Sequence, residues 1–90
     1  MIKIYAIRDR ALDAFNRPFF LTADGVAIRA FQDEINNKES EVSKHPDDYD
    51  LYSIGTYDES TGIISAHQPL QIAIGKQLVY RNQGDQNAQE

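Results

Sequence analysis

The sequence predicts an α+β fold: a small antiparallel sheet of four or five strands with one main helix packed on one face. Three observations support this class. Several short segments alternate apolar and polar residues and are separated by turn residues, which is typical of strands. Only the segment at about 24–38 repeats apolar residues at helical spacing. The chain has 90 residues, which fits a single domain.

Two strands are expected before the helix. Residues 2–7 alternate in polarity and predict the first strand. Residues 8–16 are more polar and predict a helical turn or a loop laid on the core. Residues 17–21 include Pro18, which cannot donate to a β-ladder, so we expect an edge strand or an extended packing segment there.

The helix is expected at about 24–38, with Thr22 or Asp24 as its N-cap. Asn36 and Asn37 weaken its last turn. One apolar stripe follows the helical period and predicts the buried face. The stripe consists of Ala23, Ala27, Ala30, Phe31 and Ile35.

Residues 38–50 contain a single aliphatic residue, Val42, and predict a solvated, mobile loop. Residues 51–57 predict the next strand, and residues 58–62 predict a hairpin turn in which Gly62 takes a positive φ. We therefore expect a β-hairpin in the second half of the chain.

The return strand of this hairpin is expected at 63–67, with Pro69 ending it and a last strand at 70–75. Residues 82–90 have no apolar side chain beyond Ala88 and predict a polar tail. The sequence therefore predicts one domain over 1–81.

One helix covers only one face of such a sheet. The other face would carry some of four residues in the predicted strands. These are Tyr5, Ile7, Tyr57 and Ile64. We expect either a homodimer through this uncovered face or the segment 10–21 to cover it.

Composition excludes several classes of protein. The chain has no cysteine, so disulfides and thiolate metal sites are impossible. No apolar run approaches the roughly 18–20 residues of a membrane helix, and no signal peptide is visible. We therefore expect a cytoplasmic protein without a membrane partner.

Charge is unevenly distributed along the chain, whose formal net charge is −5. Residues 1–30 carry five basic and three acidic side chains, whereas residues 31–60 carry two basic and nine acidic ones. Only the first third can attract a polyanion.

That first third also interleaves cations and aromatic rings, the pattern of single-strand nucleic-acid binders. For phosphate contact we predict Arg8, Arg10, Arg17 and Arg29. For base stacking we predict Tyr5, Tyr52 and Tyr57. Phe15, Phe19 and Phe20 are more simply interpreted as core residues.

No pattern of catalytic or metal-binding residues is convincing. Ser65 and His67 share a strand face but have no orienting acid nearby, and no serine stands in a nucleophile elbow. The acidic stretch 45–50 fails the calcium-loop spacing, and the isolated glycines form no phosphate-binding motif. We expect no enzyme activity, no metal and no cofactor.

Several stretches, in order and spacing, resemble one family. They are Tyr5–Asp9 with Ala11, Pro18–Phe20, Ala27 with Arg29 and Phe31, Asp50–Asp58, Thr61–Gly62, Pro69 and Ile72. Over about residues 2–75 the chain resembles the small nonstructural protein of gokushoviruses, single-stranded DNA bacteriophages of the Microviridae. The resemblance implies a protein of the infected bacterial cytoplasm, absent from the virion, that acts in genome replication. It supplies no catalytic residue.

Two hypotheses remain open. In the first, the protein binds single-stranded DNA or the phage or host replication proteins, without catalysis. In the second, it is a protein–protein module that inhibits or redirects a host factor through an acidic loop whose charge mimics nucleic acid. The acidic residues concerned are Glu39, Glu41, Asp47, Asp48 and Asp50.

Overall fold

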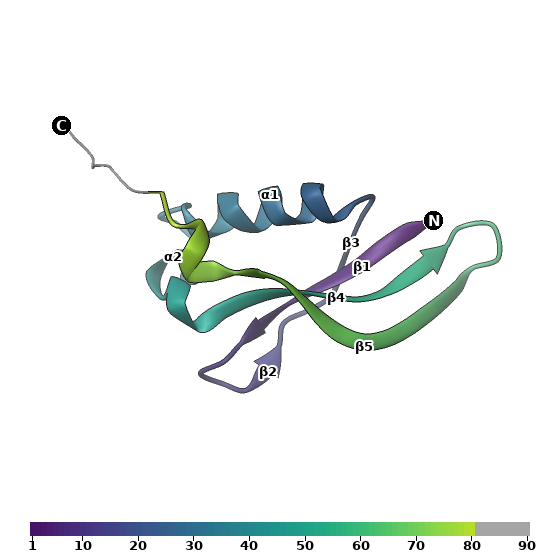
Figure 1. The fold of residues 1–90 in the computed structure, drawn as a ribbon, viewed down its shortest axis with the longest axis horizontal. Helices are drawn as coiled ribbons and strands as arrows, with labels where there is room; N and C mark the ends of the chain where they lie inside the picture. Colours follow the sequence, from purple (N-terminus) through teal and green to yellow (C-terminus); the bar gives the residue numbers. More distant parts are fainter. Residues whose placement is uncertain (81–90) are drawn as a thin grey trace.

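The computed structural model describes residues 1–80. It confirms the α+β class: a curled antiparallel sheet with one main helix on one side (Figure 1). The strands are β1 (Ile2–Asp9), β2 (Ala14–Phe15), β3 (Phe19–Leu21), β4 (Tyr49–Asp58) and β5 (Ile63–Ile74). The helices are α1 (Asp24–Ile35), the short α2 (Glu41–Lys44), and the 3-10 turns η1 (Pro46–Asp48) and η2 (Gly75–Leu78). The predicted tail at 82–90 lies outside the described residues.

The strand order is β2-β1-β4-β5, and β3 also pairs with β1. Because β4 occupies one edge of β1, β2 and β3 share the other edge, β2 beside Arg8 and Asp9 and β3 beside Lys3 to Tyr5. The segment 10–21 therefore extends the sheet sideways. Five of its twelve residues, in β2 and β3, pair in the plane of the sheet, so the segment does not cover a face as one expectation had it, whereas β3 confirms the edge strand expected at 17–21.

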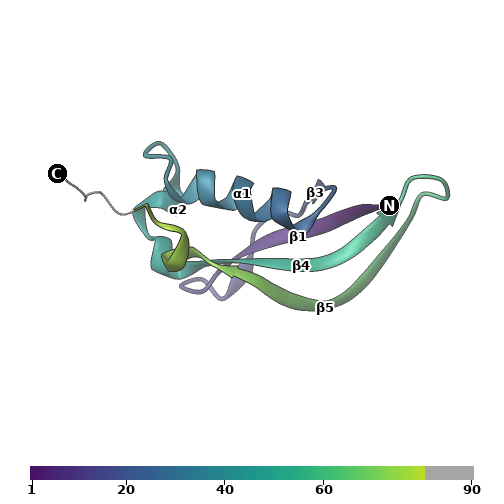
Figure 2. The same ribbon diagram turned by 45° about the horizontal axis from the view of Figure 1, so that its top comes forward.

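The last strand runs unbroken through Pro69, so the prediction that this proline separates two strands is wrong. β5 is the edge strand, where the missing N–H of proline is tolerated. The register shows how: Gly55 pairs with Ala66 and Ser53 with Leu70, so β5 holds three residues where β4 holds one. This bulge bends β5 away from β4 in mid-strand (Figure 2).

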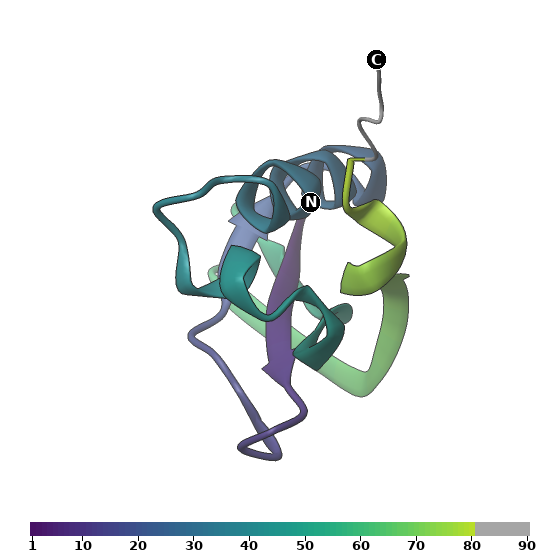
Figure 3. The same cartoon turned by 90° about the vertical axis from the view of Figure 1, so that its left-hand side faces the viewer.

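Helix α1 lies along one side of the sheet, as the end-on view also shows (Figure 3). Ala27, Phe31 and Ile35 point into the core, where they meet Tyr5 and Leu51. Of the predicted apolar stripe, Ala23 and Ala30 are exposed instead. Fewer residues of α1 are therefore buried in the core than the stripe predicted.

Helix α1 begins at Asp24, as predicted, but its N-cap and its C-terminal end differ from the prediction. The N-cap is Ala23, without a side-chain hydrogen bond, and Asp24 is the first helical residue. The helix ends at Ile35 rather than near 38. The side-chain amide of Asn36 donates to the carbonyls of Gln32 and Leu78, and it ties the helix end to η2.

The segment 38–50 contains the short helix α2 and the turn η1 and is buried at a few positions, so the predicted solvated loop is confirmed only for its exposed residues. The Ser40 hydroxyl accepts a hydrogen bond from the Val42 N–H and caps α2, and Val42 itself is buried against the core. Asp50 belongs to β4, where it pairs with Arg8, and is only 3% exposed. The cap at Ser40 and the burial of Val42 hold this part of the chain against the core.

Candidate binding surface

The side of the sheet opposite α1 also carries large apolar side chains. Along β1, Tyr5 belongs to the core under α1, whereas Ile4 lines a groove on the opposite side. We call that opposite side the open face. Its large side chains are Ile4, Phe15, Phe20, Tyr52, Tyr57 and Ile64. They come from all five strands, so the sheet as a whole builds this surface.

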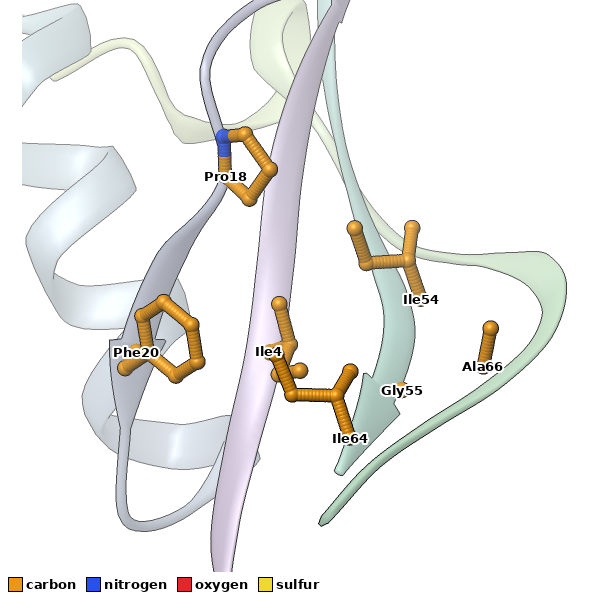
Figure 4. Close-up of a pocket in the computed structure, with 7 residues that line it drawn as sticks. All are labelled: Ile4, Pro18, Phe20, Ile54, Gly55, Ile64 and Ala66. Atoms are coloured by element: carbon orange, nitrogen blue, oxygen red, sulfur yellow. The ribbon is translucent and has the colours of Figure 1, made fainter. Parts of the chain in front are cut away.

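A groove of about 280 Å³ runs across the open face between β3, β1, β4 and β5 (Figure 4). Ile4 forms its floor, with Pro18 and Phe20 on one side and Ile64 and Ala66 on the other. The groove is almost entirely apolar, because the side chains lining it are aliphatic or aromatic.

One bulge residue and one glycine shape this groove. Ile54 is the extra residue in the β1–β4 pairing, and its side chain reaches the groove. Gly55 lies beside it, and a Cβ there would stand 2.5 Å from the carbonyl oxygen of Ser65. Glycine therefore permits the close approach of β4 and β5 that forms this end of the groove.

Four aromatic rings lie on the open face in two edge-to-face pairs. The centroids of Phe15 and Tyr52 are 5.2 Å apart, and those of Phe20 and Tyr57 are 6.0 Å apart. Phe15 is 44% exposed and Phe20 46% exposed. An antiparallel sheet that presents exposed rings on a helix-free face is a surface on which flat, apolar groups can stack.

The structure separates the predicted stacking residues. Tyr52 and Tyr57 lie on the open face, beside rings that were assigned to the core. Tyr5 is fully buried on the other side, and its hydroxyl donates to Asp24 Oδ1 at 2.7 Å. Burial raises the pKa of Tyr5 well above its ordinary value, and the hydrogen bond to Asp24 and the charge of Asp24 raise it further. The prediction that Tyr5 stacks on a base is therefore wrong.

The four predicted arginines do not form one patch. Arg8 contacts Asp13 Oδ1 at 2.6 Å. The hydrogen bond to Asp13 is the main cause of a raised pKa of the Arg8 guanidinium, and a hydrogen bond to Tyr52 is the second cause. Arg10 lies 3.0 Å from Asp50 Oδ2 and also donates to the Asp47 carbonyl. Two of the four cations are thus partly neutralised by acidic side chains.

Arg17 and Arg29 form no ion pair within residues 1–80, and both are exposed. Arg17 precedes Pro18, which lines the groove. Arg29 lies on α1, on the opposite side of the sheet. Of the four arginines, Arg8 is paired with Phe15 of the open face, and Arg17 is the chain neighbour of Pro18 in the groove.

The predicted acidic cluster is also divided. Glu39, Glu41 and Asp47 are exposed, and Asp48 is half-buried. Asp50 is buried, and it accepts a hydrogen bond from the Gly75 N–H as well as pairing with Arg10. Asp50 is therefore a structural anchor, and including it among residues that contact a partner is wrong.

A serine and a histidine do meet, but not the pair noted in the sequence. Ser53 Oγ lies 3.3 Å from His67 Nε2, and His67 Nδ1 lies 2.7 Å from the Gln68 carbonyl oxygen. The pair spans the bulge between β4 and β5. A carbonyl, not a carboxylate, faces the second ring nitrogen, so this contact braces the bulge.

Within residues 1–80, no three His, Asp or Glu side chains gather closely enough to hold a metal ion. None of the helices in this part of the chain is long and apolar enough to cross a membrane.

Sequence reasoning missed Phe15 and Phe20 as surface residues. One signal was available: Phe19 and Phe20 are adjacent, and neighbours on a strand point to opposite faces. Only one of them can lie under the helix. It is Phe19, whose ring centroid is 5.9 Å from that of Tyr5.

The fold and the open face define a small α+β protein whose candidate site is an aromatic surface on a sheet. Residues 2–78 match the family described as Phage ORF5 protein, and the chain belongs to this bacteriophage family. The match confirms the coarser part of the resemblance, a phage protein. No curated protein and no solved structure matches the chain.

Proposed function

We propose that the protein is a non-catalytic accessory factor of phage genome replication that binds single-stranded DNA across the open face. Membership of a phage family supports a role in infection. The resemblance to gokushovirus nonstructural proteins supports a single-stranded DNA genome, action in the host cytoplasm and absence from the virion. The observation that carries the proposal is the two ring pairs exposed on a helix-free sheet face.

Stacking supplies the main attraction in this proposal. A base stacked on an aromatic side chain contributes about 1–3 kcal/mol. Phe15, Phe20, Tyr52 and Tyr57 offer such rings, and the groove between them excludes water from the base. Stacking does not depend on which base is present, so the proposal predicts binding of single strands of many different sequences. It also predicts weak binding of duplex, whose bases are already stacked.

Charge contributes little in this proposal, because the chain carries a net −5 and we assign phosphate contact to two of the predicted arginines, Arg8 and Arg17. For single strands, the logarithm of the affinity falls by about 0.7 per phosphate contact for each tenfold rise in salt. Two contacts, from Arg8 and Arg17, give a loss of about sevenfold between roughly 50 and 200 mM salt. A much steeper loss would contradict this arrangement.

Fluorescence anisotropy of a labelled single strand of about 30 bases, with duplex competitor, tests the proposal. Arg17→Ala and Arg29→Ala form a matched pair, since both remove one exposed arginine, the first next to Pro18 of the groove and the second on α1. We expect Arg17→Ala to weaken binding several-fold and Arg29→Ala to leave it unchanged. Tyr52→Leu, which removes a stacking ring, weakens it at all salt concentrations. No binding at tens of micromolar in low salt rules out direct DNA contact.

A protein partner remains the second candidate, because Glu39, Glu41 and Asp47 are exposed close together in sequence. In that case the acidic side chains imitate nucleic acid for a host factor. The combined variant Glu39→Gln, Glu41→Gln, Asp47→Asn then abolishes the effect on phage replication, while Arg17→Ala does not. The opposite pattern supports DNA binding.

A further inference from the structure

The outer edge of β5 is long, exposed and uncharged. β5 is the last strand in the sheet order, and no strand within residues 1–80 pairs with its outer side. Residues 63–71 are all exposed. From Ile63 to Ile74 there is no Asp, Glu, Lys or Arg, although these types make up 26% of the chain. An edge strand of this kind presents unpaired backbone N–H and C=O groups to another strand.

Natural sheets usually protect such an edge with charge, proline or a bulge. In β5, Pro69 and the adjacent bulge interrupt the edge, but only in the middle of the strand. The stretch Ile63–Ala66 keeps unbroken register with β4, from Asp58 to Gly55. Four residues at the projecting end of the hairpin therefore form a regular edge without any protecting charge.

We propose that Ile64–Ala66 pairs antiparallel with the same stretch of a second copy of this chain, around a two-fold axis that sets Ser65 opposite its own counterpart. The lack of charge and the self-complementarity of this edge fit a second copy of this chain. Two chains of net charge −5 repel one another, so they meet best through a surface that carries no charge. A two-fold interface uses one patch twice, and an antiparallel edge strand is self-complementary in this sense.

Side chains and shape support the same pairing. Ile63 is 59% exposed and Ile64 is 60% exposed, on opposite faces of the strand. A paired strand covers part of both. The β4–β5 hairpin projects beyond the start of α1, so a second sheet can approach this edge without meeting the helix (Figure 1).

Pairing of this kind joins two sheets into one, with both open faces on the same side. If the proposed function is right, two sets of rings then form one longer track for single-stranded DNA. This consequence rests on the proposed function, whereas the pairing itself does not. The experiment below contains no DNA, so the two can fail separately.

Sedimentation velocity of the full chain from about 1 to 300 μM measures the association. We expect a monomer–dimer equilibrium. Ser65→Lys places two like charges side by side in the paired strands and is expected to weaken association at least tenfold. Ser65 lies opposite Thr56, on the side away from the rings, so this variant leaves the open face intact. Gln77→Lys is the matched control, because it makes the same charge change at an exposed site on η2.

A second measurement locates the contact. The chain has no cysteine, so Ser65→Cys or Gln77→Cys provides a unique site for a nitroxide label. In the proposed dimer the two labels at position 65 lie within about 15 Å, because paired strands are about 4.8 Å apart. Those at position 77 lie much farther apart.

Three results overturn the proposal. One is a monomer at every concentration. Another is a dimer that Ser65→Lys leaves unchanged but Phe20→Lys dissociates, which places the interface on the open face. The third is a short distance between labels at position 77 and a long one at position 65.

Discussion

The two faces of the sheet have similar side chains but different surroundings. On the side of α1, Tyr5, Phe31 and Leu51 are completely buried, and the one phenolic hydroxyl among them has a hydrogen-bond partner. On the open face, Phe20 and Ile64 keep about half or more of their surface exposed. The two faces differ in burial because α1 covers only one of them. This difference teaches that apolar strand positions alone do not decide which residues form the core.

The comparison also separates stability from binding. A side chain under α1 contributes to folding through its full burial, which for a large apolar residue is about 1.5–3 kcal/mol. A ring on the open face has buried only part of its surface, so it retains area for a ligand. Substitutions on the two faces should therefore affect different measurements.

The largest expected effect is on the covered face. Phe31→Ala removes a fully buried ring and should lower the free energy of unfolding by about 3–5 kcal/mol, enough to unfold much of the protein. Phe20→Ala on the open face should cost about 1 kcal/mol and mainly weaken DNA binding. Urea denaturation followed by circular dichroism measures both. Equal losses of stability would mean that the open face is covered in solution.

The next effect concerns the groove on the open face. Gly55→Ala brings a Cβ to 2.5 Å from a backbone oxygen of β5, so the strands must separate. We expect a loss of about 1–3 kcal/mol, typical of overpacking.

Gly25→Ala is its control in the same denaturation experiment, because no atom lies within 4 Å of a Cβ added there, in the first turn of α1. It should stabilise the protein by about 0.4–1 kcal/mol. A neutral Gly55→Ala would show that β5 moves freely.

The smallest expected effect concerns the hydrogen bond between Tyr5 and Asp24 on the covered face. Tyr5→Phe keeps the buried ring but removes the hydrogen bond to Asp24, which should cost about 0.5–1.5 kcal/mol near neutral pH. Asp24 retains Lys3, whose Nζ is 3.7 Å away.

The same hydroxyl gives the wild-type protein a pH dependence. The folded state raises the pKa of Tyr5, so above about pH 10 the unfolded chain loses its proton first. Stability from this group is complete below that pH and falls as pH rises further. Thermal melting from about pH 8 to 11 should show a smaller fall for Tyr5→Phe. Identical profiles would mean that Tyr49, whose pKa is also raised by burial, is responsible.

Much of the fold could be predicted because it rests on local patterns. The alternation in 2–7 and 51–57 and the helical repeat around Phe31 each report a strand or helix that forms where predicted. Gly62 takes the expected positive φ of 75° in the hairpin turn. Pro69 was misread because its tolerance depends on β5 being an edge strand, and strand order is not a local property.

The candidate site was less predictable. Tyr52 and Tyr57 were chosen as strand residues able to face outward, and they do lie on the open face. Tyr5 has the same local pattern, yet it points toward α1. The partners of Arg8 and Arg10 also come from turns and from a strand 40 residues away, so spacing along the chain could not reveal that these charges are paired.

The sequence by itself determined the α+β class, the one main helix and the absence of cysteine chemistry, because composition and periodicity are properties of short segments. Only the tertiary structure decided which apolar face α1 covers, which arginines stay beside the other face and which acids are buried. Those outcomes depend on strand order, on bulges at Ile54 and Pro69 and on contacts between distant residues. A one-residue shift in register exchanges the two faces of a strand, so such small features decide which rings are exposed.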